Sequence, residues 1–257
     1  LWKQEKVRAM SAAERAEPRP SFRDAWADFA SGGDAGRLLA VVFVGTVAFT
    51  MQDVLLEPYG GEILGLSVGA TTGLSAVWAG GALLGFGLAA RWLARGLDPF
   101  RMAARGILLG VCAFSSVVFS APMDSPVLFV LGAFGIGLGG GLFAIATLTA
   151  AMTLPARGVA GRGLALGAWG AAQATAAGVA IGLGGGIRDA VSGWAATGAF
   201  GDAMGASALG YTTVYHIEIA LLFVTLVVLG PLVRLSFVHP VPATQSDGKL
   251  GLADFPT

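Results

Sequence analysis

Six long apolar stretches divide this chain, and they constrain its fold more than any other feature. They cover residues 37–56, 62–93, 102–121, 125–154, 162–187 and 211–235. Each is about as long as, or longer than, the ~20 apolar residues that a helix needs to cross a bilayer. Hydrophobic residues make up 55% of the chain and charged residues only 12%, about half the charge fraction of a soluble domain. The sequence therefore predicts an all-α membrane protein with six transmembrane helices.

The basic residues predict which side of the membrane each loop faces. Of the 16 Lys and Arg residues, all but Arg188 lie before or at the start of the first stretch, or in and beside the loops that follow the second, fourth and sixth stretches. Loops rich in Lys and Arg stay in the cytoplasm. We therefore expect both termini to be cytoplasmic, with residues 52–62 on the opposite side. The net charge of zero singles out no class of partner, and we predict no nucleic-acid partner.

The segments outside the stretches predict a simple domain organisation. Residues 1–36 are expected to form a cytoplasmic linker with a short amphipathic helix, in which Phe22, Trp26 and Phe29 share a face. That helix either lies in the membrane interface or packs beneath the bundle. Residues 37–236 form the predicted six-helix bundle, and residues 237–257 form a cytoplasmic tail. The charged start is what a fragment, or the later half of a longer protein, would have.

Glycines recur at four-residue spacing in several stretches. Such spacing lets helix backbones approach closely in a membrane, so we predict a packing role for these residues. The pattern also hints at a repeat of three plus three helices, which is common in secondary transporters. The two main sets are Gly65, Gly69 and Gly73, and Gly178, Gly182 and Gly186; shorter sets are Gly135 with Gly139 and Gly137 with Gly141.

The middles of the predicted spans contain no Asp, Glu, Lys, Arg or His. Carriers of ions, sugars or amino acids usually hold such a charge within the membrane. An apolar or lipid-like cargo, or no cargo, fits this composition better. Cys112 is the only cysteine, so we predict no metal site built on cysteine. No nucleophile–base pair or phosphate loop indicates catalysis, and we expect a protein that is not an enzyme.

One polar segment interrupts the apolar pattern and is the best lead to function. Residues 51–62 read MQDVLLEPYGGE, and they continue the FT of residues 49–50 toward LGLSVGATT at residues 64–72. This run closely resembles the PucC/LhaA family, the bacteriochlorophyll-delivery branch of the major facilitator superfamily. FRDAW at residues 22–26 and GLADFP at residues 251–256 also resemble that family. The resemblance covers nearly the whole chain and implies the C-terminal six-helix half of a twelve-helix, major-facilitator-like bundle.

The resemblance implies a function that hydropathy alone does not show. It implies a light-harvesting complex assembly factor that delivers or holds bacteriochlorophyll for insertion into antenna polypeptides. Bacteriochlorophyll would be its cargo, in the inner, intracytoplasmic photosynthetic membrane of a phototrophic bacterium. The implied partners are the antenna polypeptides, with the reaction centre as a further candidate, the lipid bilayer, and the N-terminal six-helix half of the same protein. Two alternatives stay open: a transporter of a porphyrin-like or lipidic substrate, and a pigment-free scaffold for the antenna ring.

A chlorin needs an axial ligand for its Mg, which prefers hard oxygen donors. For Gln52, Asp53 and Glu57 three interpretations compete: they shape a turn made by Pro58, Gly60 and Gly61, they dock antenna polypeptides, or they hold pigment. His216 opens the predicted sixth span, and an interfacial, hydrogen-bonded histidine is the alternative to ligation there, as it is for His239. The candidate contacts with pigment or antenna are Gln52, Asp53, Glu57, Tyr59, His216 and Glu218.

The loop after the second stretch is the last candidate site. It combines a glycine-rich helix end with Arg91, Asp98 and Arg101. This pattern is similar to the loop between the second and third helices of the major facilitator superfamily, where it forms a charge latch between the two halves of the bundle. The alternative is an anchor that only follows the positive-inside rule.

Overall fold

The structure is a computed structural model that describes residues 23, 26–27, 33–153, 162–198 and 206–238. The described residues contain helices and turns, and no strand. Six helical segments in them are long and apolar enough to cross a membrane. They are Asp34–Glu62, Val68–Leu93, Pro99–Ser120, Pro126–Thr153, Gly163–Ala196 and Ser207–Val233. This confirms the predicted all-α class, and the chain is a multi-pass membrane protein. Most of the predicted linker, His239 and the tail after it lie outside the described residues.

The polar segment is a continuation of the first helix rather than a break after it. Helix α3 (Asp34–Thr50) passes through a 3-10 turn, η1 (Met51–Val54), into helix α4 (Leu56–Glu62). The predicted turn at Pro58, Gly60 and Gly61 is wrong, because all three residues lie within α4. Proline is tolerated there because the first turn of a helix has no partner for its N–H group.

The chain reverses after α4, at Gly65. This residue has φ of +64°, a left-handed conformation that favours glycine because a side chain would clash with the backbone. Ser67 then caps helix α5 (Val68–Leu93), since its side chain accepts a hydrogen bond from the Ala70 N–H. The second helix therefore begins at Val68 rather than at residue 62, and Gly65 does not belong to a helical stripe.

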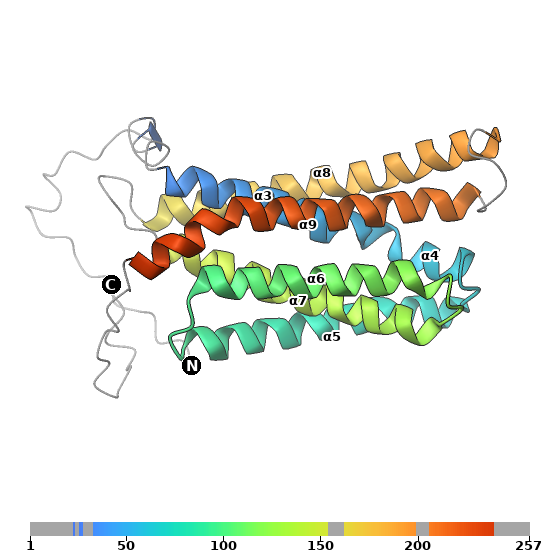
Figure 1. The fold of residues 1–257 in the computed structure, drawn as a ribbon, viewed down its shortest axis with the longest axis horizontal. Coiled ribbons are helices and arrows are strands. Elements are labelled where there is room, and N and C mark those ends of the chain that lie inside the picture. The colour runs from blue at the N-terminus through green and yellow to red at the C-terminus, as the bar shows by residue number, and fades with distance from the viewer. Residues whose placement is uncertain (1–22, 24–25, 28–32, 154–161, 199–205, 239–257) are drawn as a thin grey trace, which may run out of the picture.

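The remaining helices complete two packed groups (Figure 1). They are α6 (Pro99–Ser120), α7 (Pro126–Thr153), α8 (Arg162–Ala196) and α9 (Ala206–Val238). Helices α5, α6 and α7 pack together, as do α3, α8 and α9, and α6 joins the groups by packing on α9. Both α8 and α9 extend beyond the stretches predicted for them, 162–187 and 211–235, at the end of the bundle where α4 lies.

Close helix packing occurs at glycines, but at different ones from the main predicted sets. A Cβ at Gly137 would lie 2.1 Å from the Trp78 carbonyl oxygen, and one at Gly81 would lie 2.2 Å from that of Phe134, so side chains there would force α5 and α7 apart. Gly139 makes a similar approach to Gly106 in α6. In contrast, a Cβ would meet nothing within 4 Å at Gly65, Gly69, Gly73, Gly178, Gly182 and Gly186.

These two main glycine sets therefore do not pack helices within the described part of the chain. Helix α8 shows the reason, because its contact with η1 uses Gly184 instead. A Cβ at Gly184 would lie 2.5 Å from the Met51 carbonyl oxygen. The packing role that the four-residue spacing predicts is confirmed in α7, but spacing alone does not tell which face of a helix meets a neighbour.

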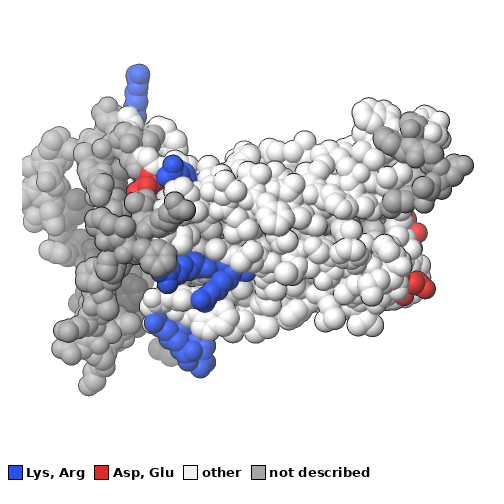
Figure 2. All heavy atoms as spheres, viewed as in Figure 1, with Lys and Arg blue, Asp and Glu red and all other residues white. Residues whose placement is uncertain are grey.

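On the face that Figure 2 shows, the described charged side chains lie toward the two ends of the bundle, with an uncharged surface between them. Basic side chains gather on the end that carries the loop from α5 to α6, where some acidic surface also shows, whereas only acidic side chains show at the opposite end. This is the distribution on which the predicted topology depends. The sidedness of the termini and the three-plus-three repeat stay predictions.

Candidate functional site

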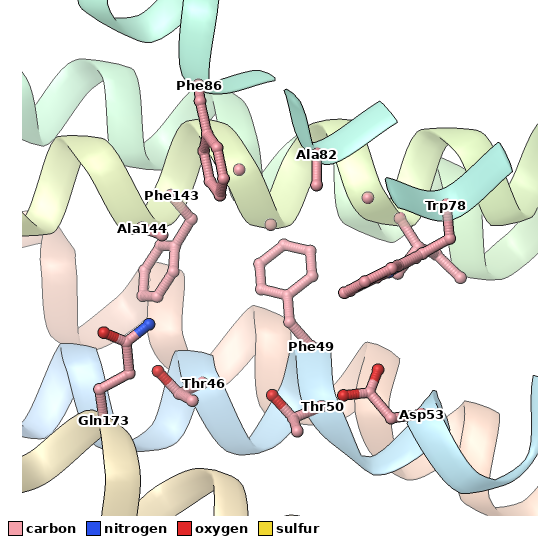
Figure 3. Close-up of a pocket in the computed structure, with 14 residues that line it drawn as sticks. Thr46, Phe49, Thr50, Asp53, Trp78, Ala82, Phe86, Phe143, Ala144 and Gln173 are labelled. Atoms are coloured by element: carbon pink, nitrogen blue, oxygen red, sulfur yellow. The ribbon is translucent and has the colours of Figure 1, made fainter. Parts of the chain in front are cut away.

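A half-open cavity of about 160 Å³ lies between the two helix groups, beside the polar segment (Figure 3). Its walls come from α3, η1, α5, α7 and α8. Four aromatic rings and several glycines make most of its surface apolar. Its lining is Thr46, Phe49, Thr50, Asp53, Trp78, Ala82, Phe86, Ile136, Gly137, Gly140, Gly141, Phe143, Ala144 and Gln173.

One side of the cavity is polar and the other is aromatic. Thr46, Thr50 and Asp53 follow one another along α3 and η1, at helical spacing, and Gln173 of α8 adds an amide group to that side. Across from them lie Trp78 and Phe86 of α5 and Phe143 of α7. The cavity thus offers flat apolar surface for a ring, together with a carboxylate and an amide oxygen at its edge.

Asp53 is connected to a second, buried group of polar residues. The Gln52 side-chain amide donates a hydrogen bond to the Asp53 carboxylate. Gln52 is itself 1% exposed. Behind it lies Glu218 of α9, which is 0% exposed and sits next to the Gln52 backbone and the Asp53 carboxylate. The prediction that the spans hold no acid in their middles is therefore wrong for the sixth, because α9 begins before residue 211 and buries Glu218 in the bundle.

An ionic cluster closes the bundle on the side of α4. Arg188 of α8 donates hydrogen bonds of 2.8 Å to the Glu62 carboxylate, to the Tyr211 hydroxyl and to the Asp189 carboxylate. Its guanidinium carbon lies 4.6 Å from the centroid of the Tyr211 ring. The arginine that departs from the positive-inside pattern thus has anionic and aromatic partners, which joins α8 to α4 and α9.

Tyr59 lies in an aromatic cluster rather than in the cavity. Its ring meets those of Tyr211 and Tyr215 edge-on, with centroids 5.5 and 5.4 Å away. It also contacts Phe129 at 5.3 Å. Such contacts fix the position of α4 against α7 and α9. Tyr59 therefore supports the site by packing and is not placed to touch a ligand in the cavity.

Glu57 and His216 lie apart from the cavity. Glu57 is exposed and accepts a hydrogen bond from the Ser75 hydroxyl of α5. His216 is exposed on α9, and its Nδ1 lies 2.7 Å from the Thr212 carbonyl oxygen. Of the six predicted contacts, the structure brings Gln52, Asp53 and Glu218 together and leaves Glu57 and His216 on the surface.

The predicted charge latch lies at the other end of the bundle. Asp98 caps α6, because its carboxylate accepts a 2.8 Å hydrogen bond from the Arg101 backbone N–H. Arg91 is exposed in the last turn of α5. A latch acts between two halves of a bundle, so the role of these residues stays a prediction.

Several residues of the site were not singled out as contacts from the sequence. Thr46 and Thr50 lie seven and three positions before the predicted Asp53, a helical spacing that puts them on its face. On α9, Tyr211 and Tyr215 have the same spacing relative to Glu218, which is itself a predicted contact. The aromatic wall gave no such signal, because apolar residues fill every stretch of this chain.

Comparison with known proteins decides the family. Residues 1–237 match the family model described as PUCC protein. The chain belongs to the PUCC protein family. This family membership confirms the resemblance inferred from residues 49–72, while the broader affiliation with the major facilitator superfamily stays a prediction. No solved structure matches the chain.

Three curated relatives show how far the similarity extends. The "Uncharacterized protein in puhA-bchM intergenic region" of Rhodobacter capsulatus is 57% identical over 257 residues, which is 100% of this chain and 53% of that protein. "Protein PucC" of Rhodovulum sulfidophilum is 51% identical over 74% of this chain and 42% of its own length. "Bacteriochlorophyll synthase 44.5 kDa chain" of Rhodobacter capsulatus is 32% identical over 65% and 39%. The chain thus spans about half the length of the curated relatives it matches.

Proposed function

We propose that this protein is a non-enzymatic light-harvesting complex assembly factor that holds or delivers bacteriochlorophyll for insertion into antenna polypeptides. Membership of the PUCC protein family supports this proposal. The observation that carries it within the structure is the cavity beside Asp53, which combines aromatic walls with oxygen donors. Its expected place is the intracytoplasmic photosynthetic membrane, with antenna polypeptides and the reaction centre as partners.

The residues of the cavity fit a magnesium chlorin in chemistry. The Asp53 carboxylate and the Gln173 amide oxygen are hard donors of the kind that Mg prefers. Trp78 and Phe86 offer rings against which a macrocycle can stack. Either Asp53 or Gln173, which lie apart along the polar side, would hold the metal as its axial ligand, and the aromatic wall would orient the ring and exclude water. His216 does not line this cavity, and we propose no ligand role for it there.

The size of the cavity indicates that this chain contributes only part of the site. Ligand pockets usually enclose about 300–1,000 Å³, whereas this one has about 160 Å³ and is half open. A chlorin would therefore protrude from it. A second surface, from the other half of the protein or from an antenna polypeptide, would have to cover the remainder.

Purification in mild detergent tests the proposal. We expect the protein to retain bacteriochlorophyll, visible in its absorption spectrum, and to co-purify with antenna polypeptides. The matched comparison is a variant with Trp78→Ala and Phe86→Ala, which should keep its helical circular dichroism and lose most of the pigment because the aromatic wall is removed.

The same preparation separates the alternatives. Antenna polypeptides without bound pigment would support the pigment-free scaffold. Substrate-dependent flux in vesicles, with neither pigment nor antenna retained, would support a transporter of a porphyrin-like or lipidic substrate. Either outcome would contradict the proposed delivery role.

A further inference from the structure

Glu218 is a buried carboxyl group that does not line the cavity, so contact with a ligand there does not explain why it is buried. It lies inside α9, is 0% exposed, and neither of its oxygens accepts a hydrogen bond with good geometry from a described residue. An ionised carboxylate buried without a partner costs several kcal/mol at least, and in practice such a group takes up a proton instead. Whether Glu218 is ionised or protonated therefore depends on the charged and hydrogen-bonding groups around it.

No described basic group of the elements packed around Glu218 lies within ion-pair distance of it. The 3-10 turn η1 contributes the Gln52 backbone and the Asp53 carboxylate. Tyr215 precedes Glu218 by about one turn on α9, and Tyr59 of α4 packs against Tyr215. On α8, the guanidinium of Arg188 is bound by Glu62, Asp189 and Tyr211. Within the described residues, no ion pair reaches Glu218.

The polar atoms near Glu218 include few hydrogen-bond donors. The Gln52 side-chain oxygen and the Tyr215 hydroxyl are also buried without a described hydrogen-bond partner. Apart from that hydroxyl, the unpaired side-chain atoms beside Glu218 are acceptors, so the group lacks donors. A proton on Glu218 supplies one, because it converts an acceptor-only carboxylate into a carboxyl group that can donate.

We propose that Glu218 and Asp53 form a proton-binding site in the middle of the bundle, with the proton on Glu218 and the negative charge on Asp53 at neutral pH. Asp53 is the partner that retains the charge because it receives the Gln52 hydrogen bond and lines the half-open cavity, whereas Glu218 is sealed. Asp53 is exposed at the cavity, so water can stabilise its charge, whereas a sealed carboxylate beside that charge and without a counter-charge does not stay ionised.

A proton fits this site better than a metal cation. The unpaired oxygens of Glu218 and Gln52 are inaccessible to solvent, and a proton needs no room beyond a hydrogen bond. A hard cation needs several oxygen ligands arranged around it. The described residues contain no group of three or more His, Cys, Asp or Glu side chains that could hold a metal ion.

Because Glu218 lies next to Asp53, which lines the cavity, a ligand in the cavity would affect the protonation of Glu218. A positively charged or metal-bearing group that binds the Asp53 carboxylate would weaken the negative potential beside Glu218 and so favour loss of the Glu218 proton. Occupation of the cavity would then be accompanied by net release of one proton from Glu218 to the surrounding water. This coupling rests on the proposed function, whereas the protonation of Glu218 does not.

Infrared spectroscopy of the purified protein in lipid nanodiscs tests the assignment. We expect the C=O stretch of a protonated carboxyl group at pH 7, shifted when glutamate is labelled with ¹³C at its carboxyl carbon and lost in Glu218→Gln. Glu57→Gln is the matched control and should keep the band, since Glu57 is exposed and bound by Ser75. The isotope shift needs no variant, so it holds even if Glu218→Gln fails to fold.

Two results would overturn the proposal. One is the absence of a glutamate carboxyl band at pH 7, which would mean that Glu218 is ionised. The other is a band that appears only when sodium is replaced by choline, which would assign the site to a metal cation. A preparation that shows the band but binds no pigment would leave the proton site intact and contradict the proposed function instead.

Discussion

Three acidic side chains of one short segment have three different environments. Asp53 faces the cavity and is bound by Gln52, Glu57 lies on the surface bound by Ser75, and Glu62 pairs with Arg188. The sequence groups them as one acidic feature, and it leaves open whether they shape a turn, dock antenna or hold pigment. Their separation along α3, η1 and α4 means that one function need not involve all of them.

The residue-scale prediction separates Asp53 from Glu57. We expect Asp53→Asn to insert normally and to lower the pigment retained per protein several-fold, because the carboxylate that faces the cavity is lost. Glu57→Gln should retain pigment at the wild-type level. The measurement is the absorption of the purified protein relative to its amount, with antenna levels in membranes as a second readout.

The double variant Asp53→Asn with Glu57→Gln extends this test to antenna assembly. We expect it to reach the membrane in normal amount and to impair antenna assembly. Normal antenna levels would reject both a ligand role and a docking role for the acidic segment. Impaired antenna with undiminished pigment would assign the segment to docking.

At the scale of elements, η1 packs closely against α8 because the residue of α8 at the contact is a glycine, which has no side chain. Gly184 lies against the Met51 carbonyl oxygen, so this contact positions Gln52 and Asp53, the next two residues. The neighbouring Gly182 belongs to the predicted glycine stripe but meets nothing in the described chain. Helix α8 therefore has one glycine face that packs within the chain and another that is open.

Alanine substitutions at these two glycines should have opposite effects. Gly184→Ala forces α8 away from η1 and should lower the free energy of unfolding by about 1–3 kcal/mol, with loss of pigment. Gly182→Ala should leave stability unchanged or raise it slightly, because alanine favours a helix over glycine by about 1 kcal/mol. Thermal unfolding in detergent measures both, and equal effects would show that the contact at Gly184 is unimportant.

The end of α6 allows a similar test of the predicted latch. Asn caps helices about as well as Asp, whereas Ala at a cap costs about 1 kcal/mol. We expect Asp98→Asn to keep wild-type stability but to reduce antenna assembly, because the charge that a latch needs is gone. Asp98→Ala should lose stability as well. Wild-type assembly in Asp98→Asn would leave Asp98 with the role of a cap alone.

At the scale of the whole molecule, the described basic side chains concentrate at one end of the bundle, and Arg188, paired with Glu62 and Asp189, lies at the other. The basic end carries the loop between α5 and α6, and the acidic end carries the loop between α6 and α7 (Figure 2). A membrane protein with this distribution is held in one orientation, because loops rich in Lys and Arg are not translocated.

Cysteine labelling checks that orientation. In a Cys112→Ser background, Asp124→Cys should react with a membrane-impermeant maleimide added from outside the cytoplasmic membrane. Arg95→Cys should react only after the membrane is permeabilised. Both positions are exposed, so the reverse pattern would place the termini outside the cytoplasm rather than in it.

The sequence by itself determined the membrane class, the six helices and the family, because these depend on local properties: the length of apolar runs, the position of arginines and one distinctive segment. It also identified Asp53 and Glu218 as candidates. It could not show that they meet, since α3 and α9 are far apart in the chain and only packing brings them together.

The tertiary structure decided which face of each helix is buried. The stripe of Gly178, Gly182 and Gly186 faces away from the rest of the described chain, Gly184 lies against η1, and Glu218 is buried behind Gln52. The physical reason is that helical spacing defines a face but not its direction. In a chain where every face of most helices is apolar, hydropathy does not distinguish the face that meets lipid from the one that meets another helix.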